Sequence, residues 1–238
     1  MSGIANGERL FSEKESRAPT IILYFFIILL VGLLLFFFFV AYSPINGESM
    51  ENTVFDGQSV VLQRRGYTLR RGDLVTADVS DKNDGSHNII KRVVGLGGDR
   101  ILFVRSQNTR NVTLYICKKG DTRLAHVDEP YIKEPMRANV SYGEYALLPF
   151  ASEELLTSFD LDAENPDGKT EELRDAVLKA CVTVSSSHVF LLGDNRNNSS
   201  DSRRYGPQHT DRLVGKVIGI ADGGSGLDRV MRFLFGLY

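Results

Sequence analysis

The chain has 238 residues, a formal net charge of −2 at pH 7 and 24% charged residues. This nearly balanced charge lacks the basic footprint of a nucleic-acid-binding protein, so we expect no nucleic-acid partner. Beyond an apolar segment near the N-terminus, roughly 195 residues remain, which is enough for one domain with a sizeable core and an insertion.

An uncharged apolar segment occupies residues 21–42, which read IILYFFIILLVGLLLFFFFVAY. As a helix rising ~1.5 Å per residue, it would be roughly 33 Å long, the thickness of the hydrocarbon core of a bilayer. The apolar part of a cleaved signal peptide is only ~7 to 15 residues long and ends in small residues, whereas this segment is rich in phenylalanine near its end. The segment is therefore predicted to be a transmembrane helix.

Basic residues flank this segment on one side. Arg9, Lys14 and Arg17 precede it, and no Lys or Arg follows it until Arg64. Because positively charged flanks stay in the cytoplasm, we expect residues 1–20 to form a cytoplasmic arm and the remainder to lie outside the cell membrane. Cys117 and Cys181 would then lie in an oxidising compartment, where they either form a disulfide or remain two buried thiols.

Short β-rich runs separated by turn formers dominate the chain beyond residue 42. Turn signals include Arg71-Gly72-Asp73 and Gly97-Gly98-Asp99. The runs cover residues 60–63, 74–79, 89–94, 100–104, 113–116, 145–148, 182–184, 188–192 and 213–220. Two glycines in the last run suit a bulge. The pattern predicts a mainly β fold.

One segment breaks this pattern. Residues 152–179 are acidic and favour helix, with Thr170 as a candidate N-cap. Leu173 and Val177 would share one helix face because they are four residues apart. We predict a short helix in a variable insertion, with its acidic side facing solvent.

A serine and a lysine are the candidate reactive residues. Ser49 follows the apolar segment in Gly47-Glu48-Ser49-Met50, and Lys91 lies in the apolar run 88–94. In a strand, Lys91 would share a face with Ile89 and Val93, while Arg92 would share the other with Ile90 and Val94. An ordinary lysine is neutral in about one molecule in 2,500 at pH 7, so a lysine base needs a pKa lowered by ~2 to 3 units, which burial can supply. The alternative is a half-exposed lysine whose amine reaches water.

Four segments in fixed order carry a family resemblance. They are residues 47–50, residues 71–75, residues 91–101 (KRVVGLGGDRI) and residues 193–203 (GDNRNNSSDSR). Together, after an N-terminal anchor, they resemble the type I signal peptidases of bacteria, which are serine/lysine membrane proteases. The resemblance covers about residues 45–104 and 188–221. It implies a signal-peptidase-like β ectodomain, with a catalytic domain of residues 43–104 and 188–238 and an inserted lobe of residues 105–187 that contains the short helix.

The resemblance also implies residue roles. Ser49 would be the acyl-forming nucleophile and Lys91 its general base, with the Ser199 hydroxyl orienting the Lys91 amine. Three further residues match a charged cluster behind the site: Arg92, Asp201 and Arg203. We expect an ion pair between Arg92 and Asp201. Two isoleucines fall where pocket-lining residues would lie, with ordinary core packing as the equal alternative: Ile45 and Ile90.

Substrates and partners follow from the same resemblance. Such enzymes remove signal peptides from exported preproteins after small residues, typically at Ala-x-Ala ends. We therefore expect preproteins and the lipid bilayer as partners, a monomer near the secretion translocon, no cofactor and no metal. The spacing of Cys and His residues supports no metal site either.

The sequence departs from the family pattern in three places. Asn52 stands where the family has proline after the nucleophile, which would loosen the turn, and Gly97 also replaces a common proline. Gly47 stands where some members supply a serine hydroxyl to the oxyanion. We therefore expect the Ser49 backbone N–H to stabilise the oxyanion, with help from a water molecule.

Several alternatives stay open. The chain could be a membrane-tethered binding protein that lost catalysis, or a relative of the self-cleaving repressors, although it has no basic DNA-binding module. The polar run 194–203 could be a cation-binding loop, although the EF-hand spacing is absent. The apolar C-terminal segment 229–238 could touch the membrane interface or dock on the core.

Overall fold

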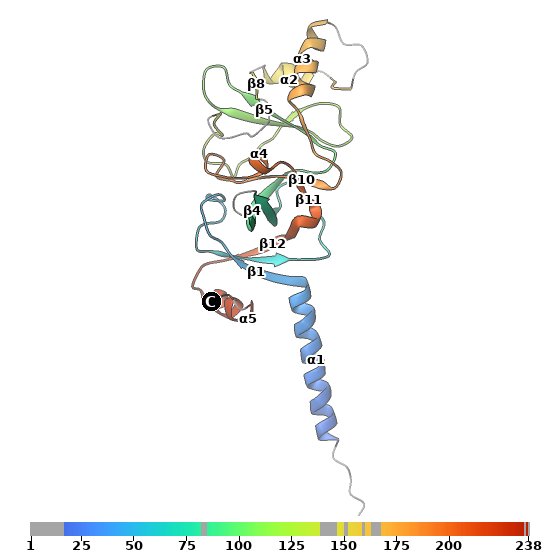
Figure 1. Ribbon diagram of the computed structural model, residues 1–238, viewed down its shortest axis with the longest axis vertical. Coiled ribbons are helices and arrows are strands. Elements are labelled where there is room, and N and C mark those ends of the chain that lie inside the picture. Colours follow the sequence, from blue (N-terminus) through green and yellow to red (C-terminus); the bar gives the residue numbers. More distant parts are fainter. Residues whose placement is uncertain are drawn as a thin grey trace, which may run out of the picture. The chain divides into compact units, whose positions relative to one another are not determined.

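The computed structural model describes residues 17–81, 85–138, 147–149, 152–158, 160–162, 168–235 and 237. The chain divides into a unit of residues 1–38 and a unit of residues 39–238. Helix α1 (Ala18–Phe39; Figure 1) is long and apolar enough to cross a membrane. None of its residues is buried. The rest of the N-terminal arm, residues 1–16 with Arg9 and Lys14, lies outside the described residues.

The helix begins and ends three residues earlier than the predicted span of 21–42. Strand β1 (Val40–Pro44) starts directly after Phe39 and pairs with β2 (Ser59–Gln63). Tyr42 is buried in this strand, and its hydroxyl donates a hydrogen bond to Asp228 at 2.7 Å. Residues 40–42 are therefore strand because their backbone and the Tyr42 hydroxyl have partners in the second unit, which an apolar sequence count cannot show.

The described part of the second unit contains two sheets, and the larger is a seven-stranded antiparallel sheet. Its order is β1, β2, β12 (Leu213–Ala221), β3 (Leu74–Asp81), β4 (Gly85–Gly95), β10 (His188–Leu192) and β11 (Gln208–His209). The register of β12 shifts before Gly215 and Gly219, so the bulges predicted from its glycines are confirmed. A Cβ at Gly215 would lie 2.8 Å from the Gln63 carbonyl oxygen, which shows how closely β12 and β2 approach there.

A second sheet contains β7 (Ala125–His126), β6 (Val112–Cys117), β5 (Arg100–Arg105) and β8 (Leu148–Pro149), with β9 (Val182–Thr183) also paired to β5. The β5–β8 pair is parallel and the others are antiparallel. We predicted the lobe to begin after residue 104, but β5 already belongs to this sheet. The change of sheet therefore falls in the turn 96–99. Tyr145 and Ala146 of the predicted run 145–148 lie outside the described residues.

Two helices accompany the second sheet, α2 (Glu153–Ser158) and α3 (Gly168–Ala180). Helix α3 starts two residues before Thr170, so Thr170 is not its N-cap. Leu173 and Val177 pack together against Leu102 and Tyr115, as the four-residue spacing predicted. The remaining helices are α4 (Ser202–Tyr205), the 3₁₀ turn η1 (Thr210–Arg212) and α5 (Gly226–Phe235).

One apolar cluster joins the two sheets. Phe103 of β5 and Phe190 of β10 lie with ring centroids 6.1 Å apart, and Val94 and Leu192 pack in the same cluster. The fold is mainly β, as predicted. Cys117 and Cys181 are free thiols that pack in the apolar cluster around α3. Val94 of β4 and Phe190 and Leu192 of β10 belong to the cluster that joins the two sheets, so the shared core supports the two strands that hold the candidate site.

Candidate active site

Ser49 and Lys91 lie in direct contact. Ser49 sits in a turn after β1, and Lys91 sits on β4 opposite Val75 of β3. Lys91 Nζ donates a hydrogen bond to Ser49 Oγ at 2.6 Å and another to the Ile90 carbonyl oxygen at 2.8 Å. Only 2% of Lys91 is exposed. The contact has the length expected of a nucleophile and its base.

The environment of Lys91 favours the neutral amine. Burial lowers the pKa of Lys91 to about 8, with Arg203 adding to this and Asp201 opposing it. With that pKa, about one molecule in ten carries a neutral Lys91 at pH 7. The amine can therefore accept a proton at physiological pH, which an exposed lysine does rarely.

The strand alternation places the neighbours as predicted. Ile89 and Val93 pack in one apolar cluster, while Ile90 packs in another with Ile45 and Met50. Arg92 projects toward the segment after Ser49, where it meets Thr53. Lys91 and Arg92 are adjacent in sequence, but their side chains contact different residues: Lys91 contacts Ser49, and Arg92 contacts Thr53.

A cleft of about 180 Å³ opens beside the two residues. The segment 43–46 before Ser49 and the segment 87–91 of β4 line it from two sides, together with Ser49 and Thr76. Ile45 and Ile90 both line this cleft, and both are more than nine-tenths buried in the core. The pocket and the core-packing interpretations of these two isoleucines therefore apply together.

The loop after β10, residues 193–203, holds the turn that carries Ser49, and we call it the clamp loop. The Asn195 N–H donates to the Ser49 carbonyl oxygen at 3.1 Å, and the Asn195 side chain donates to the Glu48 carbonyl oxygen at 3.1 Å. A Cβ at Gly193 would lie 2.5 Å from the Ser49 carbonyl oxygen and 2.2 Å from Ser199 Oγ. Only glycine fits there, because the loop must approach the backbone of Ser49 this closely.

Ser199 is near the site but does not orient Lys91 in this structure. Its buried Oγ has no hydrogen-bond partner among the described residues, and it lies against Gly193. The predicted hydrogen bond to Lys91 is therefore absent. The described partners of the Lys91 amine are instead Ser49 Oγ and the Ile90 carbonyl oxygen.

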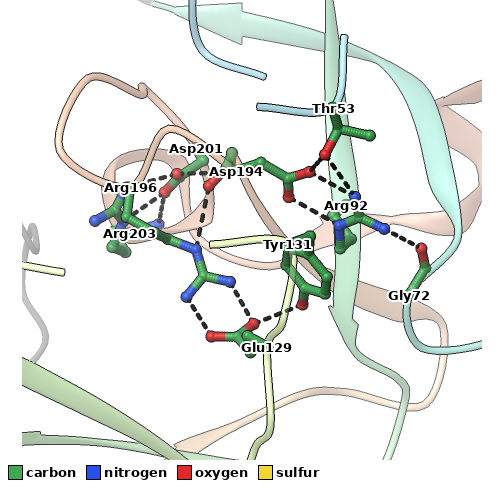
Figure 2. Close-up of polar contacts among 10 residues, drawn as sticks. Thr53, Gly72, Arg92, Glu129, Tyr131, Asp194, Arg196, Asp201 and Arg203 are labelled. Atoms are coloured by element: carbon green, nitrogen blue, oxygen red, sulfur yellow. Dashed lines mark hydrogen bonds and ion pairs between the residues drawn. The ribbon is translucent and has the colours of Figure 1, made fainter. Parts of the chain in front are cut away.

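Arg92 pairs with Asp194 rather than with Asp201. Arg92 Nε and Nη2 donate to the two Asp194 carboxylate oxygens at 2.8 and 2.5 Å, as Figure 2 shows. The reason is the register: Arg92 lies opposite Leu192, so Asp194 follows two residues after the position facing it. Asp194 also accepts a hydrogen bond from the Thr53 hydroxyl at 2.5 Å. The pair thus connects β4 to the turn that carries Ser49.

Asp201 is occupied by Arg203. Arg203 Nε and Nη2 donate to its two carboxylate oxygens at 2.8 and 2.7 Å, and the Gly193 N–H donates at 3.0 Å. Although burial opposes the charged form, the hydrogen bonds and charge of Arg203 hold the pKa of Asp201 below its usual range. Asp201 and Arg203 are both almost fully buried, as expected of the charged cluster. Because Asp201 accepts the hydrogen bond from the Gly193 N–H, the pair ties the end of the clamp loop to its start.

Three members of this cluster did not emerge from the sequence pattern. The Tyr131 ring stacks on the Arg92 guanidinium, 3.9 Å from its central carbon, and its hydroxyl donates to Glu129 at 2.7 Å. Arg196 makes a two-pronged ion pair with Glu129 (Figure 2). Its Nε also donates to the Gly193 carbonyl oxygen at 3.1 Å. Glu129 and Tyr131 come from the lobe, between the motifs 91–101 and 193–203 and outside both, and no local pattern marks them.

Asn52 takes a backbone conformation that proline cannot adopt. Its φ is +93°, whereas the proline ring fixes φ near −65°. Asparagine tolerates positive φ better than most residues. The turn after Ser49 is therefore built differently from a proline turn, rather than being a loosened version of it.

The Gly47 and Ser49 backbone amides have different roles. The Gly47 N–H donates to the Asp56 carboxylate at 2.7 Å. The Ser49 N–H has no hydrogen-bond partner among the described residues.

Within the described ranges there is no group of three His, Cys, Asp or Glu side chains placed to hold a metal ion.

Comparisons with known proteins agree on one family. A family model described as signal peptidase, peptidase S26, matches residues 18–221, and the chain belongs to this family. Signal peptidase IB of Staphylococcus aureus (strain Mu50) is 31% identical over 176 residues, which are 73% of each chain. Signal peptidase I of Bacillus caldolyticus is 31% identical over 176 residues, which are 73% of this chain and 74% of that protein.

A solved signal peptidase I from Enterococcus faecalis V583 is also similar, with 23% identity and a TM-score of 0.35. The match covers 65% of this chain and all of that one.

Proposed function

We propose that this protein is a membrane-anchored serine endopeptidase that removes signal peptides from exported preproteins, with Ser49 as nucleophile and Lys91 as general base. The observation that carries the proposal is the 2.6 Å contact between a buried lysine amine and a serine hydroxyl. Membership of the signal peptidase family supplies the class of substrate.

The chemistry requires only groups already in place. Ser49 Oγ attacks the scissile carbonyl carbon as its proton passes to Lys91 Nζ, and the carbonyl oxygen becomes an oxyanion. The Ser49 N–H stabilises this oxyanion. When the C–N bond breaks, Lys91 returns the proton to the leaving amine, and the new chain end remains as an ester on Ser49. A water molecule then gives a proton to Lys91 and attacks the ester, and Ser49 recovers its hydroxyl proton as the acid leaves.

The cleft explains a preference for small residues. The cleft has a volume of about 180 Å³ and lies between the two flanking segments. Ile45 and Ile90 form apolar parts of its wall. An extended substrate laid between segments 43–46 and 87–91 would present its side chains there as an added strand does. Alanine would fit such a site, which supports the expected cleavage at Ala-x-Ala ends.

The anchor completes the proposal. Helix α1 would cross the cell membrane with the N-terminal arm in the cytoplasm, as the position of its basic residues indicates. Ser49 follows the end of α1 by ten residues, so cleavage occurs where a translocated signal peptide leaves the bilayer. We further propose that the protein acts as a monomer beside the secretion translocon.

The test is cleavage of a preprotein with an Ala-x-Ala site by the full chain in detergent. Ser49→Ala and Lys91→Ala should abolish cleavage. Lys119→Ala, at an exposed lysine of the lobe, is the matched control and should keep it. Full activity of Lys91→Ala with an unchanged pH profile would overturn the assignment of the base. No cleavage by the unaltered chain would instead favour a binding protein.

A further inference from the structure

The C-terminal helix α5 is held on β1 by one of its faces. Asp228 of α5 accepts hydrogen bonds from the Tyr42 hydroxyl at 2.7 Å and the Ser59 hydroxyl at 2.8 Å. Met231 is buried in the same contact, and the Phe235 ring stacks on Tyr42 with centroids 6.2 Å apart. These contacts fix the orientation of α5, so its opposite face is defined.

That opposite face carries exposed apolar side chains. The side chains of Leu227, Val230, Phe233 and Leu234 are 60, 56, 67 and 40% exposed. With 3.6 residues per turn, these four fall within an arc of about 120° and form one stripe. Arg229 is exposed at the edge of the stripe. Contiguous exposed apolar side chains beside a basic residue mark an interaction surface rather than chance exposure.

The chain itself places this stripe close to the end of α1. Tyr42, which holds Asp228, is only three residues beyond Phe39. Because a strand rises ~3.3 Å per residue, Tyr42 lies within about 10 Å of the last turn of α1, whatever the direction of that helix. A membrane crossed by α1 therefore has its surface within reach of α5.

We propose that the stripe formed by Leu227, Val230, Phe233 and Leu234 is inserted in the headgroup region of the membrane that α1 crosses. The partner is an anionic lipid surface, because Arg229 flanks the apolar side chains as basic residues do in interfacial helices. The proposal rests on α1 as an anchor and is independent of peptidase activity. With α1 and α5 as two contacts, the second unit is restrained from rotating about a single tether, which fixes the height of the cleft above the bilayer.

The absence of tryptophan from the chain provides a direct test. Phe233→Trp gives the full-length protein a single tryptophan, which lies on the stripe and can be excited selectively over the tyrosines. The protein is reconstituted in phosphatidylglycerol/phosphatidylcholine vesicles, with and without lipids brominated on their acyl chains. Bromolipids should remove most of the emission from this variant. Leu155→Trp, on helix α2 of the lobe, replaces a comparably exposed apolar residue and should keep its emission.

A second variant separates insertion from anchoring. Val230→Asp, added to Phe233→Trp, should abolish quenching but leave flotation with vesicles and cleavage of a soluble peptide unchanged. Equal quenching at positions 233 and 155 in floated protein would refute the proposal. The proposal would also be refuted if quenching of the position-233 emission by bromolipids decreased as the protein concentration rose, because a second copy of the chain would then cover the stripe. Protein that fails to float refutes the anchor and the proposal together, whereas failure of the proposed function appears only as lost cleavage.

Discussion

The ion pair between Arg92 and Asp194 gives the sharpest energetic prediction. Asp194 is fully buried and the Arg92 side chain is 11% exposed. Replacing Asp194 with asparagine leaves the arginine charge buried without a counter-ion, which typically costs about 3 to 5 kcal/mol. We expect Asp194→Asn to lower the free energy of unfolding by roughly this amount.

The chain offers a matched control on its surface. Arg100 and Asp162 form a pair with similar two-pronged geometry, but the Asp162 side chain is 54% exposed. Water compensates an exposed charge, so Asp162→Asn should cost only about 0 to 1 kcal/mol. Both substitutions replace a carboxylate with an amide. They differ in burial and in the hydrogen bond that Asp194 also accepts from Thr53.

Urea denaturation of the full chain in detergent measures both values, and double-mutant cycles identify the partner. Arg92→Met with Asp194→Asn should show a coupling energy of more than ~1 kcal/mol, whereas Arg92→Met with Asp201→Asn should be nearly additive. Coupling to Asp201 instead, or equal destabilisation by Asp194→Asn and Asp162→Asn, would show that the pairing or the role of burial is wrong.

Substitutions at three other positions test the site. Because burial lowers the pKa of Lys91 from 10.5 to about 8, the unfolded chain binds the extra proton between these values and stability should rise with pH across that window. Lys91→Met should therefore remove this rise and add up to ~3 kcal/mol at pH 7, while cleavage, which in the unaltered chain increases toward pH 8, is lost; unchanged stability in urea at pH 7 would contradict the buried charge. Gly193→Ala should abolish cleavage because its Cβ would lie 2.5 Å from the Ser49 carbonyl oxygen, and wild-type kcat/KM in a preprotein assay would disprove the close approach. Asn52→Gly should keep the activity because glycine accepts the φ of +93°, whereas Asn52→Pro should lower both activity and melting temperature; an active, more stable proline variant would show that the turn takes another form.

Local patterns predicted the parts of the site that depend on one strand. The alternation along β4 separated Lys91 from Arg92, and the apolar run around Lys91 indicated the burial that lowers its pKa. The β runs and the glycine bulges of β12 also followed from period and turn chemistry. These features are decided within a few residues of each other, so the sequence carries them directly.

Features that depend on pairing between distant segments were missed or misassigned. Arg92 was paired with Asp201 because both belong to the motifs, but the register of β10 on β4 places Asp194 closer. Asp194 and Asp201 lie in the same motif, so the motif alone does not show which carboxylate pairs with Arg92. Glu129 and Tyr131 carried no such signal, because their place beside Arg92 depends on how the lobe packs. The start of β1 at Val40 likewise depends on Asp228, almost two hundred residues away.

The position of β12 between β2 and β3 has a consequence for the order of events during synthesis. Both reactive residues have been translated by residue 91, yet β2 and β3 stay unpaired edges until residues 213–221 leave the ribosome. Unpaired edges invite wrong strand pairing, and distant contacts form slowly. The clamp loop at 193–203 also arrives late. The growing chain is therefore without a formed site until residues 193–221 have been made. A product truncated before residue 193 should carry an anchor and both reactive residues but cleave nothing.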